Sequence, residues 1–355
     1  MDHLSKQRPS RQVAIWLLVG AGMIVIQILL GGITRLTESG LSITEWKPIT
    51  GALPPLNEGA WQTEFDKYKL TDQFKYVHQH FSLSDFKFIF FWEWFHRLWA
   101  RLMGLVFLVG FIYFLTRKKF ERTMVKPIAV LFLLGALQGA IGWIMVKSGL
   151  VPERYFVGHI ELATHFIAAL GLLGYTIWFA LQILVRPGQF VLNAPLKKFL
   201  MAISILLVLQ LVYGAFMAGL KAGPVAPTWP DINGNFIPPE INNLDPWFKN
   251  LVANSYTIQF IHRGLAYLLF ILILTWWYRA RAIKGNILFS RFRTGALLLV
   301  TLQIVLGVLT VLNATYPNRL VLLGVSHQFV AMLLLAVMMC LLFLTRRNSH
   351  PGSIV

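Results

Sequence analysis

The residues best suited to chemistry are Glu93, His96 and Arg97, which stand inside an apolar run from about 88 to 115. A run of that length can cross a bilayer, which takes roughly 20 apolar residues. Ionisable side chains are costly inside a membrane, so each one is a candidate functional group that needs a partner. Three further histidines lie in comparable apolar runs, at His165, His262 and His327.

Paired imidazoles in a helical bundle favour one kind of centre, the iron of a haem. The single cysteine, Cys340, is interpreted as a small buried apolar residue, so no thiolate or carboxylate set completes a tetrahedral zinc site. Glycines at equivalent positions would let a flat macrocycle approach the helices, although glycine also permits plain helix packing. These glycines are Gly31, Gly142, Gly214 and Gly307.

One acidic residue distinguishes the first site from the others. Glu93 lies three residues before His96 on the same helical face, whereas Gln259 lies three residues before His262. A carboxylate beside one site and a neutral amide beside the other predict different roles. An ion pair with Arg97, four residues on, is the alternative explanation of the acid.

Two of the histidines are each followed by an arginine, Arg97 or Arg263. A guanidinium binds a carboxylate through two parallel hydrogen bonds, so both arginines could hold haem propionates. They could equally snorkel to the membrane surface or pair with a neighbouring helix. Because Arg263 has no acid four residues before it, an ion pair alone does not explain why an arginine stands at both places.

The remaining polar candidates are expected to be structural. His159 lies at a helix end and off the face of the next buried histidine. His78 and His80, in a long loop, are expected to be solvated surface residues rather than metal ligands. Thr164 and Ser326 are expected to hydrogen-bond to their own helix backbone.

These side chains must be positioned by helices that cross a membrane. The chain has 355 residues, a mean hydropathy of +0.62, 56% hydrophobic residues and 13% charged ones, which excludes a soluble domain of this size. We expect an all-α polytopic protein whose even number of spans returns both termini to one side. The eight predicted spans are 12–34, 88–116, 126–147, 158–184, 197–220, 255–279, 290–312 and 320–344.

The residues that give the net charge of +17 lie mainly in alternate connections, which are on one side of the membrane. They are not concentrated in a patch that would bind nucleic acid. Cations cluster before the first predicted span and after the second, fourth, sixth and eighth. This positive-inside pattern predicts that both termini are cytoplasmic. Because no small-residue cleavage site follows the first span, that span is expected to be retained. The sequence therefore predicts a multi-pass protein of the cell inner (plasma) membrane with no nucleic-acid partner.

The chain also repeats itself. A shift of 183 residues superposes Gln27 on Gln210 and Gly31 on Gly214, and the later spans match at offsets of 166, 165 and 162. We expect two pseudo-symmetric four-helix bundles in the same orientation, 1–190 and 191–355.

A finer repeat lies beneath this one. Each odd-numbered span contains glutamine, three residues and glycine, and each even-numbered span carries one of the four histidines. Each of these histidines lies seven or eight residues from the predicted outer end of its span. At 1.5 Å per residue, the four imidazoles share one layer roughly 11 Å deep.

Two outer connections, 35–87 and 221–254, are long for loops without structure. The second part of the first connection carries aromatic residues among charges, which predicts short interfacial helices. The second connection is a shorter copy of the first.

The chain resembles the haem A synthase family over nearly all of its length. The resemblance rests on the segment 31–42 (GGITRLTESGLS), on Trp46-Lys47-Pro48, on the segment 93–97 and on the four histidines. It implies an oxidoreductase that converts the C8 methyl group of haem O into the formyl group of haem A by successive hydroxylations, for cytochrome oxidase assembly. The first outer loop has no cysteine pair, so the chain is similar to the cysteine-poor proteobacterial and mitochondrial members.

For the C-terminal half, the resemblance implies a resident haem b cofactor. Its axial iron ligands would be His262 and His327, with Arg263 as a further cofactor-binding residue.

For the N-terminal half, the resemblance implies binding of the substrate, haem O. His96 and His165 would hold the substrate iron, with Arg97 as a further substrate-haem-binding residue. Glu93 matches the essential acid of the family and is the expected catalytic residue.

The implied partners are haem O, membrane lipid, a haem O synthase and an electron donor such as a ferredoxin, with a homo-oligomer left open. The alternative function is a di-haem b-type electron-transfer cytochrome. Such a protein would usually place its haems at two depths, whereas the four histidines here share one layer. A haem carrier without catalysis would need no acid at Glu93.

Overall fold

The computed structural model describes residues 11–45 and 50–346, and the elements it contains there are helices. Eight of them are long and apolar enough to cross a membrane, so the chain is an all-α, multi-pass membrane protein. They confirm the eight predicted spans. Their bounds are α1 (Arg11–Leu36), α4 (Leu83–Thr116), α5 (Arg122–Gly149), α6 (His159–Leu184), α7 (Ala194–Gly219), α9 (Ser255–Ala280), α10 (Ile287–Leu312) and α11 (Pro317–Leu344).

Several helices begin ahead of the apolar run because caps determine where they start. α4 begins at Leu83, where Ser82 and Asp85 form a capping box. The backbone N–H of Ser82 donates to Asp85 Oδ2 at 2.8 Å, and the Ser82 hydroxyl accepts from the Asp85 N–H at 3.3 Å. Such reciprocal bonds satisfy backbone groups that would otherwise lack partners. The side-chain oxygens of Asn193 and Asn286 cap α7 and α10 by accepting from the backbone N–H of Leu196 and Phe289.

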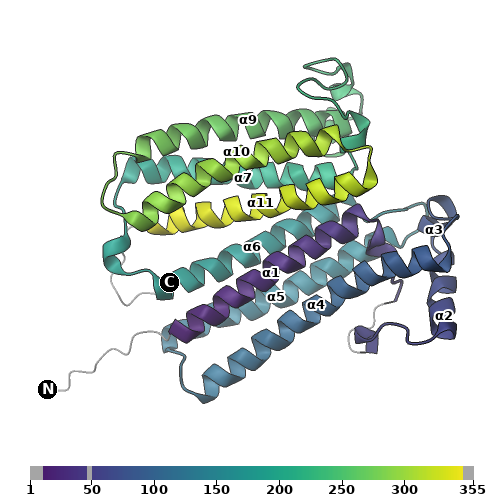
Figure 1. The fold of residues 1–355 in the computed structure, drawn as a ribbon, viewed down its shortest axis with the longest axis horizontal. Coiled ribbons are helices and arrows are strands. Elements are labelled where there is room, and N and C mark those ends of the chain that lie inside the picture. The colour runs from purple at the N-terminus through teal and green to yellow at the C-terminus, as the bar shows by residue number, and fades with distance from the viewer. Residues whose placement is uncertain (1–10, 46–49, 347–355) are drawn as a thin grey trace.

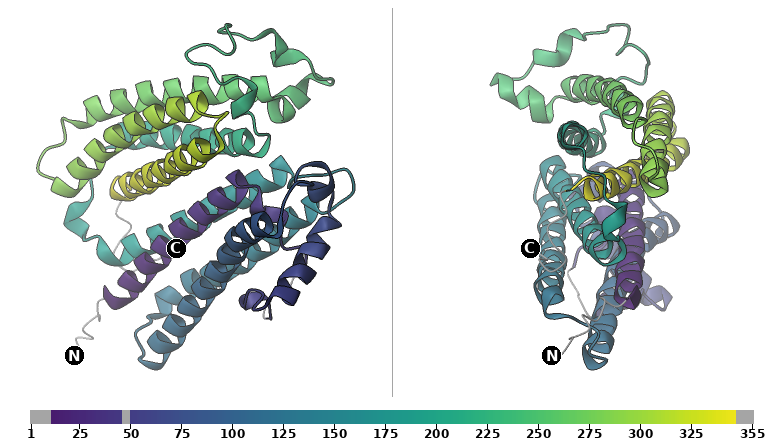
Figure 2. Two further views of the ribbon diagram at one scale, coloured as in Figure 1. Left: turned by 45° about the vertical axis from the view of Figure 1, so that its right-hand side comes forward. Right: turned by 90° about the vertical axis from the view of Figure 1, so that its left-hand side faces the viewer.

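The eight long helices form two sets that lie side by side (Figures 1 and 2). The N-terminal set is α1, α4, α5 and α6, and the C-terminal set is α7, α9, α10 and α11. In the C-terminal set each helix packs against the next, and α11 closes the ring on α7. In the N-terminal set α1 packs against α4 and α6, and α5 packs against α6. The two sets meet where α6 and α1 pack against α7 and α11.

The largest buried cluster fills the C-terminal set and the junction between the sets. It includes Leu200, Trp276 and Phe289 of the C-terminal set, together with Ile28 of α1 and Leu173 of α6. Close packing of such side chains gains dispersion energy that lipid contact would not supply in full. Burial is uneven between the sets. In the most apolar 18-residue stretch of each helix, 50% of the residues are buried in α11, 6% in α4 and 11% in α5.

The outer connections fold into short helices, which the sequence predicted for the second part of the first one. The first holds η1 (Ser39–Leu41), η2 (Thr50–Ala52), α2 (Glu58–Lys69) and α3 (Asp72–Tyr76). The second holds η4 (Gly223–Val225), η5 (Pro239–Asn242), η6 (Trp247–Lys249) and α8 (Asn250–Ala253), while η3 (Pro187–Gln189) joins α6 to α7. Phe65 and Tyr68 of α2 pack on Phe86 of α4, which fastens the first connection over the outer end of that helix.

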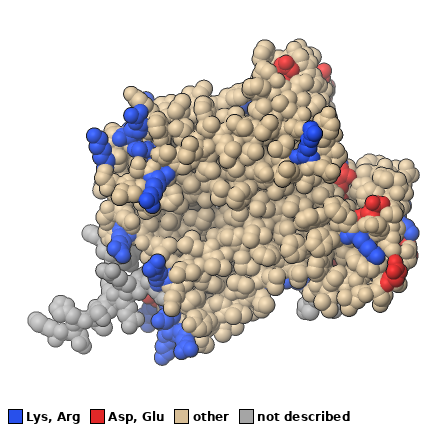
Figure 3. All heavy atoms as spheres, viewed as in Figure 1, with Lys and Arg blue, Asp and Glu red and all other residues tan. Residues whose placement is uncertain are grey.

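Charged residues separate along the helix axes. In Figure 3 most Lys and Arg side chains gather at the end of the molecule where the chain termini lie, and Asp and Glu gather at the opposite end. This is the distribution that the alternate clusters of cations predict. The motif residues Trp46, Lys47 and Pro48 lie outside the described residues.

Candidate functional site

Each of the four intramembrane histidines faces a glycine on a neighbouring helix. The glycine is in every case the twenty-first residue of its helix, counted from Arg11, Arg122, Ala194 or Ile287. A Cβ atom built on the glycine would lie within 3.4 Å of the imidazole, so the missing side chain makes room for the ring. The distances are 3.4 Å for Gly31 to His96 Nε2, 2.8 Å for Gly142 to His165 Cε1, 3.3 Å for Gly214 to His262 Cε1 and 3.0 Å for Gly307 to His327 Cε1.

A glutamine one turn before the glycine also belongs to this arrangement. The amide nitrogens of Gln210 and Gln303 lie 3.4 and 3.2 Å from Nε2 of His262 and His327. Gln138 Nε2 lies 3.2 Å from His165 Nδ1. The sequence showed the repeated spacing of glutamine and glycine but not that the glutamine touches the histidine. Within the described residues, the amide oxygen Oε1 is buried without a hydrogen-bond partner in Gln27, Gln138, Gln210 and Gln303.

The fold brings His262 and His327 together as the sequence predicted. Their ring centroids are 6.4 Å apart and their planes lie at 70°. Two imidazole nitrogens on opposite sides of one metal ion, each about 2 Å from it, would put the centroids about 6 Å apart. Nδ1 of each ring is buried and has no hydrogen-bond partner in the described part of the chain. The spacing, the unsatisfied ring nitrogens and the glycine recesses fit a haem iron held between two histidines.

The N-terminal set contains the second predicted pair. His96 lies on α4 and His165 on α6, where their rings face Gly31 and Gly142. Among the described residues, no group of three or more His, Cys, Asp and Glu side chains could hold a metal ion. Both pairs therefore supply two imidazoles each, which suits a haem iron better than a metal caged by protein ligands alone.

Glu93 is buried at the outer end of the N-terminal set, with 4% of its surface exposed. Arg97 Nε donates to Glu93 Oε1 at 2.6 Å, so the ion pair considered as an alternative from the sequence is present. The same guanidinium donates to the carbonyl oxygens of Ile43 at 3.1 Å and Glu45 at 3.3 Å. Arg97 thus fastens the first outer connection to the carboxylate.

The C-terminal set repeats this construction without the acid. Arg263 Nη2 donates to Gln259 Oε1 and to the carbonyl oxygen of Ala226 at 3.2 Å, and Nη1 donates to the carbonyl oxygen of Asp231 at 2.7 Å. Gln259 in turn donates to the Ala222 carbonyl at 2.6 Å. The two arginines are held in the same way, with a carboxylate in the N-terminal set where the C-terminal set has an amide.

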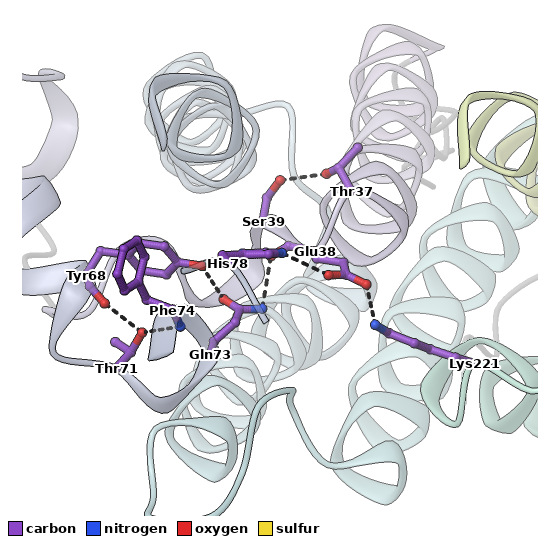
Figure 4. A network of polar contacts seen from close by, with 9 residues as sticks. All are labelled: Thr37, Glu38, Ser39, Tyr68, Thr71, Gln73, Phe74, His78 and Lys221. Atoms are coloured by element: carbon purple, nitrogen blue, oxygen red, sulfur yellow. Dashed lines mark hydrogen bonds and ion pairs between the residues drawn. The ribbon is translucent and has the colours of Figure 1, made fainter. Parts of the chain in front are cut away.

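A polar network built on Glu38 joins the first outer connection to the second (Figure 4). Its carboxylate bonds to His78 Nε2 at 3.0 Å and to Lys221 Nζ, while His78 Nδ1 lies 2.7 Å from the Tyr68 hydroxyl. Burial alone would raise the pKa of Glu38, but the hydrogen bonds and charges of His78 and Lys221 lower it to about 2. At neutral pH this residue is therefore an anion that holds the two outer connections together.

The expectation of a solvated His78 was wrong. Its exposed fraction is 5%, because its ring stacks on Phe81 at 4.0 Å and both ring nitrogens have partners. His80 is exposed, as expected. The sequence could not distinguish the two, because the partners of His78 come from elements up to 40 residues away.

The contacts of the other three residues expected to be structural agree with that role. His159 is the first residue of α6 and packs edge-on against Phe216 at 5.9 Å, outside both imidazole pairs. The hydroxyls of Thr164 and Ser326 each donate at 2.8 Å to a carbonyl four residues earlier in their own helix, which confirms that prediction.

Residues 14–339 match a protein family, COX15-CtaA, described as "Cytochrome oxidase assembly protein". The chain is 40% identical to "Heme A synthase" of Rhodospirillum centenum over 342 residues, which cover 96% of this chain and 90% of that one. It is 40% identical to "Heme A synthase" of Nitrosospira multiformis over 328 residues, 91% of this chain and 90% of that one. With "Heme A synthase" of Parvibaculum lavamentivorans the identity is 44% over 269 residues, 76% of this chain and 78% of the relative.

Proposed function

The chain belongs to the haem A synthase family of cytochrome oxidase assembly proteins, and we propose that it oxidises the C8 methyl group of haem O to the formyl group of haem A. The observation that carries the proposal is the pair of matching histidine sites that differ by one buried acid, Glu93, in place of Gln259. One site has the residues of a plain haem-holding centre, and the other has an added proton-transferring group.

The C-terminal half, residues 191–355, is the cofactor half in this proposal. His262 and His327 hold haem b through its iron, and Gln210 and Gln303 keep the two rings in place. Arg263 secures the outer connection over this site through its bonds to two carbonyls. When bound, haem b supplies one-electron redox chemistry.

The N-terminal half, residues 1–190, is the substrate half. His96 and His165 hold haem O, and Arg97 orients the carboxylate of Glu93 by binding its Oε1. The second oxygen, Oε2, is the atom to which we assign proton transfer, because Arg97 binds Oε1. Two hydroxylations of a methyl group give a geminal diol, which must lose water to become an aldehyde. Glu93 Oε2 moves the proton from one hydroxyl to the departing one in that step.

In this proposal the protein lies in the cell inner membrane with both termini cytoplasmic, which the charge distribution in Figure 3 supports. The histidines then lie nearer the outer face. A haem O synthase supplies the substrate and an electron donor of the ferredoxin kind exchanges electrons with the protein. A homo-oligomer is compatible with the large apolar surface of the spans.

The alternative, a di-haem b electron-transfer cytochrome, fits the arrangement less well. The four glycines that meet the histidines are each the twenty-first residue of their helix, which supports placing both pairs in one layer. A cytochrome that carries electrons across the membrane needs haems at two depths. Neither such a cytochrome nor a passive haem carrier has a use for a buried carboxylate beside only one of the two histidine pairs.

The decisive experiment is reversed-phase chromatography of the haems extracted from purified wild type and from Glu93→Gln and His262→Ala variants. Glu93→Gln installs the residue of the cofactor half and keeps an acceptor for Arg97. We expect wild type to contain haem b with haem O, haem A or a hydroxylated intermediate, Glu93→Gln to accumulate haem O, and His262→Ala to lose haem b. Two equivalents of haem b, unchanged in Glu93→Gln, would establish the electron-transfer alternative instead.

A further inference from the structure

The second outer connection, residues 221–254, exposes aromatic side chains and buries polar ones. Trp247 is 66% exposed and Phe248 is 55% exposed. Asn250 and Asn254, by contrast, are 2% and 5% exposed. A segment surrounded by water has the opposite arrangement, because burying apolar surface is favourable and burying an amide is costly unless it finds a partner. The connection is therefore built for surroundings that are at least partly apolar.

The buried asparagines provide the hydrogen-bond partners that such surroundings would not. Nδ2 of Asn254 donates to the carbonyl oxygen of Glu240 at 2.7 Å and lies 2.8 Å from the side-chain oxygen of Asn250. Asn250 in turn accepts from the N–H of Leu244 at 3.1 Å and donates to its carbonyl oxygen at 2.9 Å. Away from water, backbone polar groups must find their partners inside the protein. These bonds meet that condition at the end of the connection that leads into α9.

The first outer connection has the usual polarity, although the internal repeat relates it to the second. Its aromatic residues Phe65 and Tyr68 are buried against α4. On its surface Lys69 and Asp66 form an ion pair at 3.0 Å. It carries seven charged residues between positions 58 and 76, against three between positions 232 and 254 of the second connection. The inverted polarity thus belongs to the second connection and is not a general property of the outer loops.

The place of the second connection in the fold indicates what its aromatic surface meets. In Figure 1, where the long helices run across the picture, the connection rises beyond α9 to the side of the bundle, and both views of Figure 2 agree. Trp229 Nε1 donates to the hydroxyl of Tyr267 at 2.9 Å. Tyr267 is twelve residues, roughly 18 Å, into α9 and is exposed on that span. The connection therefore overhangs the surface of a membrane-spanning helix, where the neighbouring medium is lipid.

The composition of the exposed surface fits the boundary between lipid headgroups and acyl chains. Tryptophan is enriched at that level of a membrane because its ring is apolar and its N–H needs a polar partner. Asp245 and Lys249 are exposed on either side of Trp247 in the sequence, and their charges need water or headgroups. Phe236 is a further exposed aromatic residue of the connection. A surface of this mixed kind fits neither plain water nor the hydrocarbon core.

We propose that the second outer connection lies on the outer leaflet of the membrane, with Phe236, Trp247 and Phe248 inserted at the boundary between headgroups and acyl chains. The inference does not depend on which reaction the protein catalyses. It gives the connection two attachments, lipid on one side and α9 on the other, where Arg263 binds two of its carbonyl oxygens. The cover over the C-terminal histidine pair is thereby held against the bilayer.

Spin labels on single cysteines test this placement. Phe236→Cys and Phe248→Cys are made in a Cys340→Ala background, because Cys340 is the only cysteine of the chain. The labelled proteins are reconstituted into phosphatidylcholine vesicles with a nickel chelate on both sides of the membrane. Power-saturation EPR then measures how often each label meets oxygen, which concentrates in lipid, and the chelate, which stays in water. Glu58→Cys, on the charged surface of α2, is the water reference, and Ile271→Cys, on an exposed face of α9, is the lipid reference.

We expect the labels at positions 236 and 248 to meet oxygen more often than the chelate, as the label at position 271 does, and the label at position 58 to show the reverse order. If the chelate exceeds oxygen at either position, the connection faces water there and the proposal is wrong. If both reagents are excluded, a second copy or another protein covers the connection, which also refutes it. A label that lowers the unfolding temperature in detergent marks a disturbed fold, and Trp247→Cys in the same exposed stretch then decides by the same criterion.

Discussion

Glu38 and Lys221 form an ion pair across the two halves although they occupy equivalent positions of the internal repeat, 183 residues apart. Both residues follow the end of a long helix, and both adopt the left-handed conformation, with φ of 58° and 50°. Equivalent residues of a two-fold repeat can touch only near the axis that relates them. In the same region Arg35 donates to the carbonyl oxygen of its own counterpart, Ala218, at 2.6 Å. A duplicated chain can place opposite charges on the two sides of that axis.

Breaking this pair should loosen the junction between the halves. A Lys221→Met substitution leaves Glu38 partly buried with only His78 as a side-chain partner, which should cost about 2 kcal/mol. Exchanging the charges, Glu38→Lys with Lys221→Glu, should recover part of that loss. Thermal unfolding in detergent of the single and double variants measures the coupling, and strictly additive effects would show that the pair contributes nothing.

The same network predicts destabilisation by acid. The pKa of Glu38 is about 2 in the folded chain and about 4.3 in an unfolded one. Since folding lowers this pKa, the stabilisation is fully present above about pH 4.3 and is lost as the pH falls toward 2. A Glu38→Gln variant should show a smaller drop in unfolding temperature than wild type between pH 5 and pH 3. An equal drop would assign the acid sensitivity to other carboxylates.

The glycine recesses should be intolerant of even one methyl group. In Gly307→Ala the new Cβ would lie 3.0 Å from His327 Cε1, so the ring must shift. We expect haem b content to fall and the absorbance spectrum of the remainder to change. Gly295→Ala on the same helix, where the added atom meets open space, is the control. A Gly307→Ala protein with full haem b and an unaltered spectrum would contradict the assigned role.

The glutamines are expected to act as positioning residues for the histidines. Replacing Gln303 with leucine removes the amide that lies 3.2 Å from His327 Nε2. Loss of a residue that orients a metal ligand typically costs about 10-fold to 100-fold in metal affinity. Haem retention during dilution and the reduction potential of haem b should both change in Gln303→Leu. Gln303→Asn, which keeps an amide on a shorter side chain, is the comparison variant. If Gln303→Leu behaves as wild type does, Gln303 has no positioning role.

The sequence determined the elements and their pairing because those properties are local or periodic. Span length and apolarity follow from the thickness of a bilayer. The repeat placed His262 opposite His327 before any contact was known, since equivalent helices of equivalent hairpins must lie at equivalent depths. The difference between Glu93 and Gln259 can likewise be read directly from the amino-acid sequence.

Only the tertiary structure decided which neighbours fill the space around those residues. Gly307 makes room for an imidazole, Glu38 meets its own repeat equivalent, and His78 is buried by aromatic rings from the same connection. The looser backbone packing of α4 against α5 likewise depends on how far apart two helices settle. Periodicity records which face of a helix is apolar or small. It does not record what packs against that face, because packing depends on the shapes of side chains brought together from distant parts of the chain.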